Sequence, residues 1–157
     1  MRPGRPPANA AFRRVIHSRM ADVEVVCTEI RRHLEANGLA AACFAVELAT
    51  RECLCNAVIH GNDRDPKKRI HLDLRIGRTW LRLQVTDAGP GFNWREVRKV
   101  PRDDTARDGR GLAICALYAE RVAFNRRGNR ISIWIRKRKG GEPCPSISWT
   151  RMRSGAS

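Results

Sequence analysis

Apolar and polar side chains alternate in short stretches of the chain, and this period of two predicts β-strands. Together with the turn residues between them, these stretches predict five strands, at residues 12–18, 70–76, 80–85, 122–126 and 130–137. The turns at Gly77-Arg78 and Arg127-Gly128-Asn129 join four of these strands into two hairpins.

Three other segments are predicted to be helical, at residues 20–36, 40–60 and 111–121. The first repeats apolar residues every three or four positions, with Ser18 as a possible cap and Asn37-Gly38 as its stop. The second ends at Gly61. Residues 92–108 have no clear period and many charges, so we expect a mobile loop there.

The order is therefore strand, helix, helix, strand, strand, loop, helix, strand, strand. Strands joined by hairpins, with helices gathered elsewhere, predict an α+β fold. We expect a two-layer α/β sandwich in which helices cover one face of a mostly antiparallel sheet. A single domain at residues 11–138 would lie between a disordered N-terminal tail, 1–10, and a basic, irregular C-terminal tail, 139–157.

Composition narrows the class of protein. A chain of 157 residues can bury a core, and no apolar run approaches the roughly 20 residues that cross a bilayer. The basic N-terminus lacks the apolar segment of a signal peptide. The six cysteines form no Cys-x-x-Cys pair and fall mostly on apolar helix positions, which suits a reducing compartment. We therefore expect a cytoplasmic protein without membrane association.

The net charge of +15 raises the question of nucleic-acid binding. Both ends of the chain carry much of this charge, and the rest is spread over the middle of the sequence. Because a nucleic-acid-binding domain usually concentrates its charge on one folded face, we do not expect direct nucleic-acid binding.

Candidate chemistry begins in the second predicted helix. Residues four apart share one helix face, so Glu52, Asn56 and His60 point the same way. Mg²⁺ prefers oxygen ligands and keeps several waters, so the Asn56 carboxamide with phosphate oxygens is a suitable ligand set. Glu52 could then deprotonate a hydroxyl or water that attacks the terminal phosphate. Taken alone, the pair is better explained as a solvated helix acid and a helix-end hydrogen bonder.

Two glycine segments lie further along the chain. A strand ends in Asp87-Ala-Gly89-Pro-Gly91, where a carboxylate could accept a hydrogen bond from the N6 amino group of adenine, and the glycines permit close approach of the backbone. Gly109-Arg110-Gly111 opens a helix, and N–H groups at a helix N-terminus bind phosphate. An ordinary turn and a helix cap without ligand explain these two segments equally well.

In this order and topology, the three segments resemble the GHKL ATPase superfamily, which includes gyrase, heat-shock chaperone, histidine kinase and MutL. They match its N box at Glu52-x-x-x-Asn56-Ala-x-x-His60-Gly61, its first glycine box at Asp87-x-Gly89-x-Gly91 and its second at Gly109-x-Gly111-Leu112. The resemblance covers residues 12–137 and implies the Bergerat ATP-binding fold, with the loop between the glycine boxes as an ATP lid.

The compact form, with Asn-Ala-x-x-His-Gly in the N box, is most similar to the bacterial anti-sigma-factor serine/threonine kinases. That resemblance implies a homodimeric ATP- and Mg²⁺-dependent kinase. Such a kinase sequesters a sigma factor and phosphorylates a serine of an anti-anti-sigma antagonist. It makes Glu52 the general base, Asn56 the Mg²⁺ ligand and Asp87 the adenine reader. The remaining nucleotide-binding residues would be Gly89, Gly91, Gly109, Arg110, Gly111 and Leu112.

Two alternatives stay open. One is a nucleotide-dependent switch that binds a partner protein without significant kinase activity. The other is a stand-alone ATPase module of the histidine-kinase type. The second has a weaker basis, because no long helical hairpin with a phosphoacceptor histidine precedes the N box in this sequence.

Overall fold

The computed structural model describes residues 10–93, 115 and 117–137 of the chain. Its sheet has five strands in the order β1-β2-β3-β5-β4, and every neighbouring pair is antiparallel. The strands are β1 (Ala11–His17), β2 (Arg69–Ile76), β3 (Trp80–Asp87), β4 (Arg121–Phe124) and β5 (Arg130–Arg136). The predicted strands and both hairpins are confirmed.

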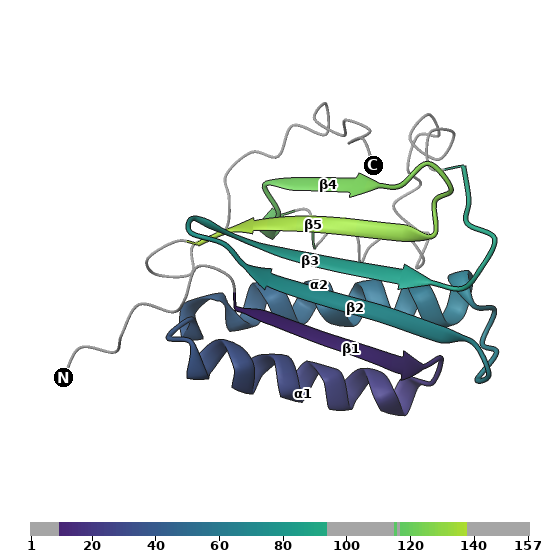
Figure 1. Ribbon diagram of the computed structural model, residues 1–157, viewed down its shortest axis with the longest axis horizontal. Coiled ribbons are helices and arrows are strands. Elements are labelled where there is room, and N and C mark those ends of the chain that lie inside the picture. Colours follow the sequence, from purple (N-terminus) through teal and green to yellow (C-terminus); the bar gives the residue numbers. More distant parts are fainter. Residues whose placement is uncertain (1–9, 94–114, 116, 138–157) are drawn as a thin grey trace.

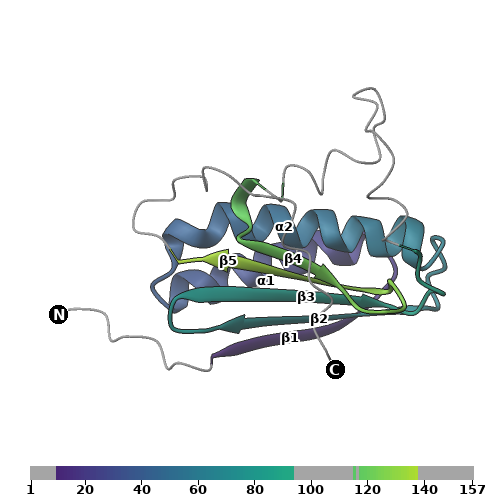
Figure 2. The same ribbon diagram turned by 90° about the horizontal axis from the view of Figure 1, so that it is seen from above.

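The described helices lie on one face of this sheet (Figures 1 and 2). They are α1 (Met20–Ala36), the 3₁₀-helix η1 (Ala40–Ala42), α2 (Cys43–Asn56) and the π-helix η2 (Ala57–Gly61). The predicted α+β sandwich, with an antiparallel sheet covered on one face, is therefore confirmed. None of the described helices is both long and apolar enough to cross a membrane.

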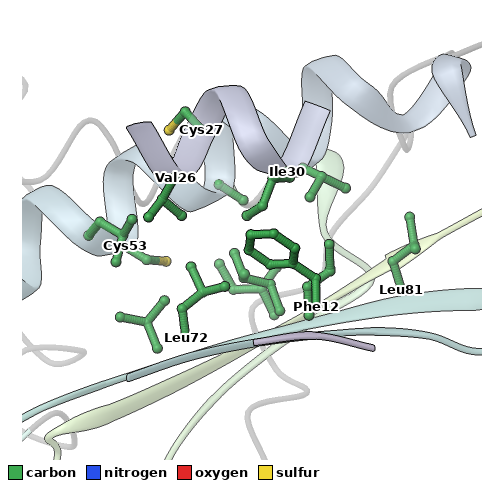
Figure 3. Close-up of a cluster of buried hydrophobic side chains, with 14 of the residues drawn as sticks. Phe12, Val26, Cys27, Ile30, Cys53, Leu72 and Leu81 are labelled. Atoms are coloured by element: carbon green, nitrogen blue, oxygen red, sulfur yellow. The ribbon is translucent and has the colours of Figure 1, made fainter. Parts of the chain in front are cut away.

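The core lies between the helices and the sheet, and strand alternation supplies one side of it. Leu72 and Leu74 of β2 and Leu81 and Leu83 of β3 are buried, whereas the residues between them are not. Figure 3 shows Val26 and Ile30 of α1 and Cys53 of α2 directed toward Phe12 and Leu72 of the sheet. Burial of this apolar area is the main force that holds the two layers together.

The first helix begins and ends close to its predicted bounds, but its predicted cap is wrong. The residue at the N-terminal cap is Arg19, without a side-chain hydrogen bond. Ser18 is buried one residue earlier, where its N–H donates to the carbonyl of Lys68 at 3.1 Å and so joins the strand layer. At the other end Gly38 takes a φ of +70°, as expected of the predicted stop.

The end of the third predicted helix is also wrong. Tyr118 is helical, but Ala119 is not, and Arg121 already begins β4. The reason is pairing with the sheet, since the N–H of Glu120 donates to the carbonyl of Trp134 in β5 at 2.7 Å. Several predicted features lie outside the described residues, namely the tails at 1–9 and 138–157, the loop from residue 94 onward and the helix start at Gly111.

Candidate functional site

Helix α2 carries Glu52 and Asn56 in its last two turns. Both residues lie within the regular α-helix Cys43–Asn56, so the spacing of four places them on one face, as predicted. Both side chains are half-buried. Within the described part of the chain, neither takes part in a hydrogen bond or an ion pair. The acid and the carboxamide are therefore not engaged by the described residues.

The helix changes character directly after Asn56. In η2 the N–H of Asn62 donates to the carbonyl of Ala57 at 2.7 Å, a bond between residues five apart. This π-turn ends at Gly61. His60 is exposed, whereas Glu52 and Asn56 are half-buried. Single π-turns of this kind occur often at functional sites.

Gly61 and Asp87 meet where η2 and β3 end. A Cβ atom at Gly61 would lie 2.4 Å from both Cγ and Oδ2 of Asp87, so only glycine leaves room for this carboxylate. Oδ1 of Asp87 accepts a hydrogen bond from the N–H of Gly89 at 2.8 Å, whereas Oδ2 accepts none from another described residue. The loop therefore fixes one carboxylate oxygen, whereas the other accepts no hydrogen bond from another described residue.

Burial raises the pKa of Asp87 above its ordinary value near 3.8. The hydrogen bond from Gly89 and the positive charges of Arg127 and Lys68 act in the opposite direction and favour the ionised form. The site thus holds a half-buried carboxylate at the end of a strand, beside bare backbone.

The two other glycines of this loop also pack against backbone. A Cβ atom at Gly89 would lie 1.8 Å from the carbonyl oxygen of Gly61. Gly91 has a φ of +80°, and a Cβ atom there would lie 1.9 Å from the carbonyl oxygen of Arg127. Gly89 and Gly91 therefore allow the loop after β3 to lie between η2 and the β4–β5 turn.

Three asparagines that the sequence did not single out hold this arrangement. Asn62 is fully buried, and its side chain accepts from the N–H of Ala88 at 2.9 Å and donates to the carbonyl of Arg69 at 3.3 Å. Asn129 pairs with Asp87 through two hydrogen bonds of 3.0 Å, one from each residue. Asn62 directly follows Gly61 of the N box, and this position was the signal that the sequence offered for it.

The third asparagine, Asn125, organises the β4–β5 turn. Its Oδ1 accepts from the N–H groups of Gly128, Asn129 and Arg130 at 2.9–3.1 Å. This turn lies beside Asp87 because β3 pairs with β5, although these two strands are far apart in the sequence. Periodicity along the chain contains no signal for that pairing.

The two cysteines closest to Asn56 pack with the core, Cys53 within it and Cys55 against it. Cys53 is buried, and burial raises its pKa well above the ordinary value. Burial, followed by the negative charge of Glu52, raises the pKa of Cys115 to about 12. These thiols stay protonated at neutral pH and are poor nucleophiles and metal ligands. The thiol of Cys115 donates to the carbonyl of Leu48 in α2 at 3.9 Å, so Cys115 packs against the helix that carries Glu52.

The described residues fit a nucleotide with Mg²⁺ in two respects. Asp87, at the end of β3, offers an ionisable carboxylate that Gly61 and Gly89 leave room for, and Asn56, at the end of α2, offers a neutral side-chain oxygen. The described part of the chain holds no group of three His, Cys, Asp or Glu side chains suited to a metal ion. An ion at Asn56 would therefore take most of its ligands from phosphate and water, which is usual for Mg²⁺.

The structure thus brings together Asp87, Gly89 and the end of the N-box helix, and keeps Glu52 and Asn56 on one face of that helix. Gly109, Arg110, Gly111 and Leu112 lie outside the described residues. The α+β sandwich and this cluster at the end of the sheet are those of a nucleotide-binding domain.

Residues 16–137 match the family model of the histidine kinase-like ATPase domain. The match spans most of the chain, so this protein belongs to the histidine kinase-like ATPase domain family. Membership implies an ATP-binding site. Comparison with curated proteins gives no significant match.

Proposed function

We propose that this protein is an ATP-dependent serine/threonine kinase that acts as an anti-sigma factor in the cytoplasm. It would sequester a sigma factor and phosphorylate a serine of an anti-anti-sigma antagonist, and it would act as a homodimer. One observation carries the kinase part of this proposal. Glu52, a half-buried acid without a partner among the described residues, lies one turn before Asn56 on the same helix face.

Asp87 would select the base. Its carboxylate can accept a hydrogen bond from the N6 amino group of adenine, whereas guanine presents an acceptor oxygen at that position and would be repelled. The Gly89 N–H holds one oxygen of Asp87 in place. Gly61 leaves room for the Asp87 carboxylate, and Gly89 leaves room for the carbonyl of Gly61, so these two glycines let the end of η2 and the loop after β3 lie together around Asp87.

Asn56 and Glu52 would act at the phosphate end. Bound Mg-ATP supplies the phosphoryl group, and the Asn56 carboxamide oxygen would serve as a protein ligand to the ion. Glu52 would accept the proton of the serine hydroxyl as its oxygen bonds to the terminal phosphorus. The bond from that phosphorus to the bridging oxygen breaks, and ADP leaves. Glu52 is suited to this because no described residue occupies its carboxylate.

The choice of partners rests on the resemblance of the N box, Asn56-Ala-x-x-His60-Gly61, to that of the anti-sigma kinases. In such a system the sigma factor and the antagonist would compete for the kinase, and phosphorylation would release the antagonist. The family match supports the ATP-binding domain beneath this proposal.

The substitution Glu52→Gln tests the kinase activity. We expect phosphate transfer from radiolabelled ATP to an antagonist protein of the host to fall by about 10²-fold or more, because a positioned general base contributes that much. Affinity for Mg-ATP should stay within a few-fold of wild type. The control is Glu35→Gln, an exposed acid on α1, which should leave both quantities unchanged.

Transfer at the wild-type rate by Glu52→Gln would show that Glu52 is not the base. If wild type binds Mg-ATP and a sigma factor but phosphorylates no antagonist, the protein is a switch and the kinase proposal is wrong. If a pull-down from the host yields a receiver-type protein instead of a sigma factor, the anti-sigma role is wrong.

A further inference from the structure

The face of the sheet opposite the helices is rich in arginine. Figure 1 looks onto this face, with α2 behind the sheet. Strand alternation places seven arginines on it and only one carboxylate at a strand position, that of Asp73. The arginines are Arg13, Arg69, Arg75, Arg82, Arg121, Arg130 and Arg136. No lysine occupies a strand position on this face, and no described helix covers it. We call these residues the arginine face.

The strand register aligns part of this face in one row. Arg75 of β2 lies opposite Arg82 of β3, which lies opposite Trp134 of β5, and Trp134 lies opposite Arg121 of β4. Neighbours in such a row are about 4.8 Å apart. The guanidinium of Arg121 is 4.6 Å from the ring centroid of Trp134. The row therefore runs across four strands as two arginines, a tryptophan and a third arginine.

Most of this positive charge has no acidic partner among the described residues. Asp73 accepts from both Arg13 and Arg75, at 2.9 and 3.1 Å, and Glu120 pairs with Arg136 at 2.5 Å. The remaining four, Arg69, Arg82, Arg121 and Arg130, form no ion pair within the described part of the chain. Arg82 even has a buried Nε without a hydrogen-bond partner there. The arginine face therefore carries a net positive charge that an anionic ligand could neutralise.

We propose that the arginine face binds single-stranded nucleic acid. Arginine presents a planar fork that matches phosphate oxygens and also stacks on bases, which lysine does not do. Aromatic side chains set among such cations give unpaired bases a surface for stacking. Trp134 lies inside the row, and Trp80, opposite Arg136, is exposed at its margin. Phosphates and bases would thus both find suitable groups on one flat surface.

The sequence alone argued against this, since its central charges are scattered along the chain. The pleat brings the scattered arginines onto one face, because side chains of alternate residues lie on the same side of a sheet.

Other occupants fit the face less well. A second copy of the chain docked face to face would place arginines against arginines. Duplex DNA offers grooves that admit a helix or a two-stranded ribbon rather than a broad sheet. An acidic protein would neutralise the arginines, but its carboxylates would not stack on the tryptophan between them as a base would.

Fluorescence anisotropy of a labelled single-stranded oligonucleotide with the full-length protein tests the proposal. The variant combines Arg75→Gln, Arg82→Gln and Arg121→Gln. Its control loses the same charge from exposed positions off the face, through Arg19→Gln, Arg32→Gln and Arg64→Gln. We expect the slope of log affinity against log salt to become shallower by about 2 in the first variant. The slope should change little in the control.

Stacking is tested separately with Trp134→Leu, and with Trp80→Leu as the more exposed second variant. Each should weaken binding by about fivefold or more without changing the salt slope, because a base is lost from the aromatic surface but no phosphate contact is lost. Circular dichroism and thermal unfolding establish that each variant is folded.

Three results would overturn the proposal. The first is that the face variant and its control lose the same affinity and show the same change in the slope of log affinity against log salt. The second is that wild type binds a duplex of the same length as tightly as it binds the single strand. The third is binding of polyglutamate or of phosphatidylserine vesicles by a protein that does not bind the oligonucleotide.

Discussion

At the residue scale, Asp87 combines a raised pKa with the role in adenine recognition that we propose for it. Burial raises its pKa, so folding disfavours the ionised carboxylate. The adenine recognition that we propose needs this ionised form as a hydrogen-bond acceptor. A group with this conflict and no role in the core is typical of a binding site.

The substitution Asp87→Asn should therefore not destabilise the fold at neutral pH. Because the folded-state pKa is raised, the wild-type carboxyl favours folding most below its ordinary value near 3.8. That contribution is lost as pH rises through the folded-state pKa. The asparagine Oδ1 can still accept from Gly89, so we expect the variant to gain stability relative to wild type as pH increases over this window.

Urea unfolding of both proteins at a series of pH values measures this difference. The control is Asp63→Asn, which removes the same charge from an exposed turn residue. A stability difference between wild type and Asp87→Asn that does not change with pH would show that the carboxyl is not held in a desolvated state.

At the scale of elements, the site depends on the contact between the end of η2 and the loop after β3. Gly61 and Gly89 form this contact, but their missing side chains have different neighbours. Gly61 faces the flexible end of the Asp87 side chain, and Gly89 faces the backbone of Gly61.

Three glycine substitutions should separate these effects. In Gly61→Ala, Asp87 moves aside, so nucleotide affinity falls while stability changes little. In Gly89→Ala, two backbone segments must part, so stability falls by about 2 kcal/mol or more and affinity is lost with it. In Gly38→Ala the space is open and only the φ of +70° is strained, which costs about 1 kcal/mol without affecting affinity.

Urea unfolding and nucleotide titration of the three variants test this ordering. If Gly61→Ala binds Mg-ATP as well as wild type does, Asp87 is not held where nucleotide recognition needs it.

The elements that the sequence predicted well are those with strong periodicity. Alternation identified β2 and β3, and the spacing of Val23, Val26, Ile30 and Leu34 identified α1. The π-turn at Ala57–Gly61 could not be predicted from the sequence, because an apolar segment of the same composition can form either an α-helix or a π-helix. The spacing of Glu52 and Asn56 predicted that they share one face of α2, whereas their proposed roles came from the resemblance to the N box together with the two glycine segments. The asparagines Asn125 and Asn129 were missed because their role depends on the pairing of β3 with β5.

At the scale of the whole molecule, the sheet separates two surfaces. One end of it, with η2 and the β4–β5 turn, forms the candidate nucleotide site. The arginine face lies on the side of the sheet away from the described helices, and the other side packs against α1 and α2 (Figure 2). The high net charge is therefore not only a property of the chain ends, since the folded domain presents a basic surface of its own.

The central claim is that Asp87 reads an adenine base, and isothermal titration calorimetry with Mg-ATP and Mg-GTP tests it most directly. We expect wild type to bind Mg-ATP and to bind Mg-GTP far more weakly. Asp87→Asn should lose at least about tenfold in affinity for Mg-ATP, because a hydrogen bond to a charged acceptor is lost. No binding of Mg-ATP by wild type at millimolar concentration, or equal affinity for Mg-GTP, would contradict the claim.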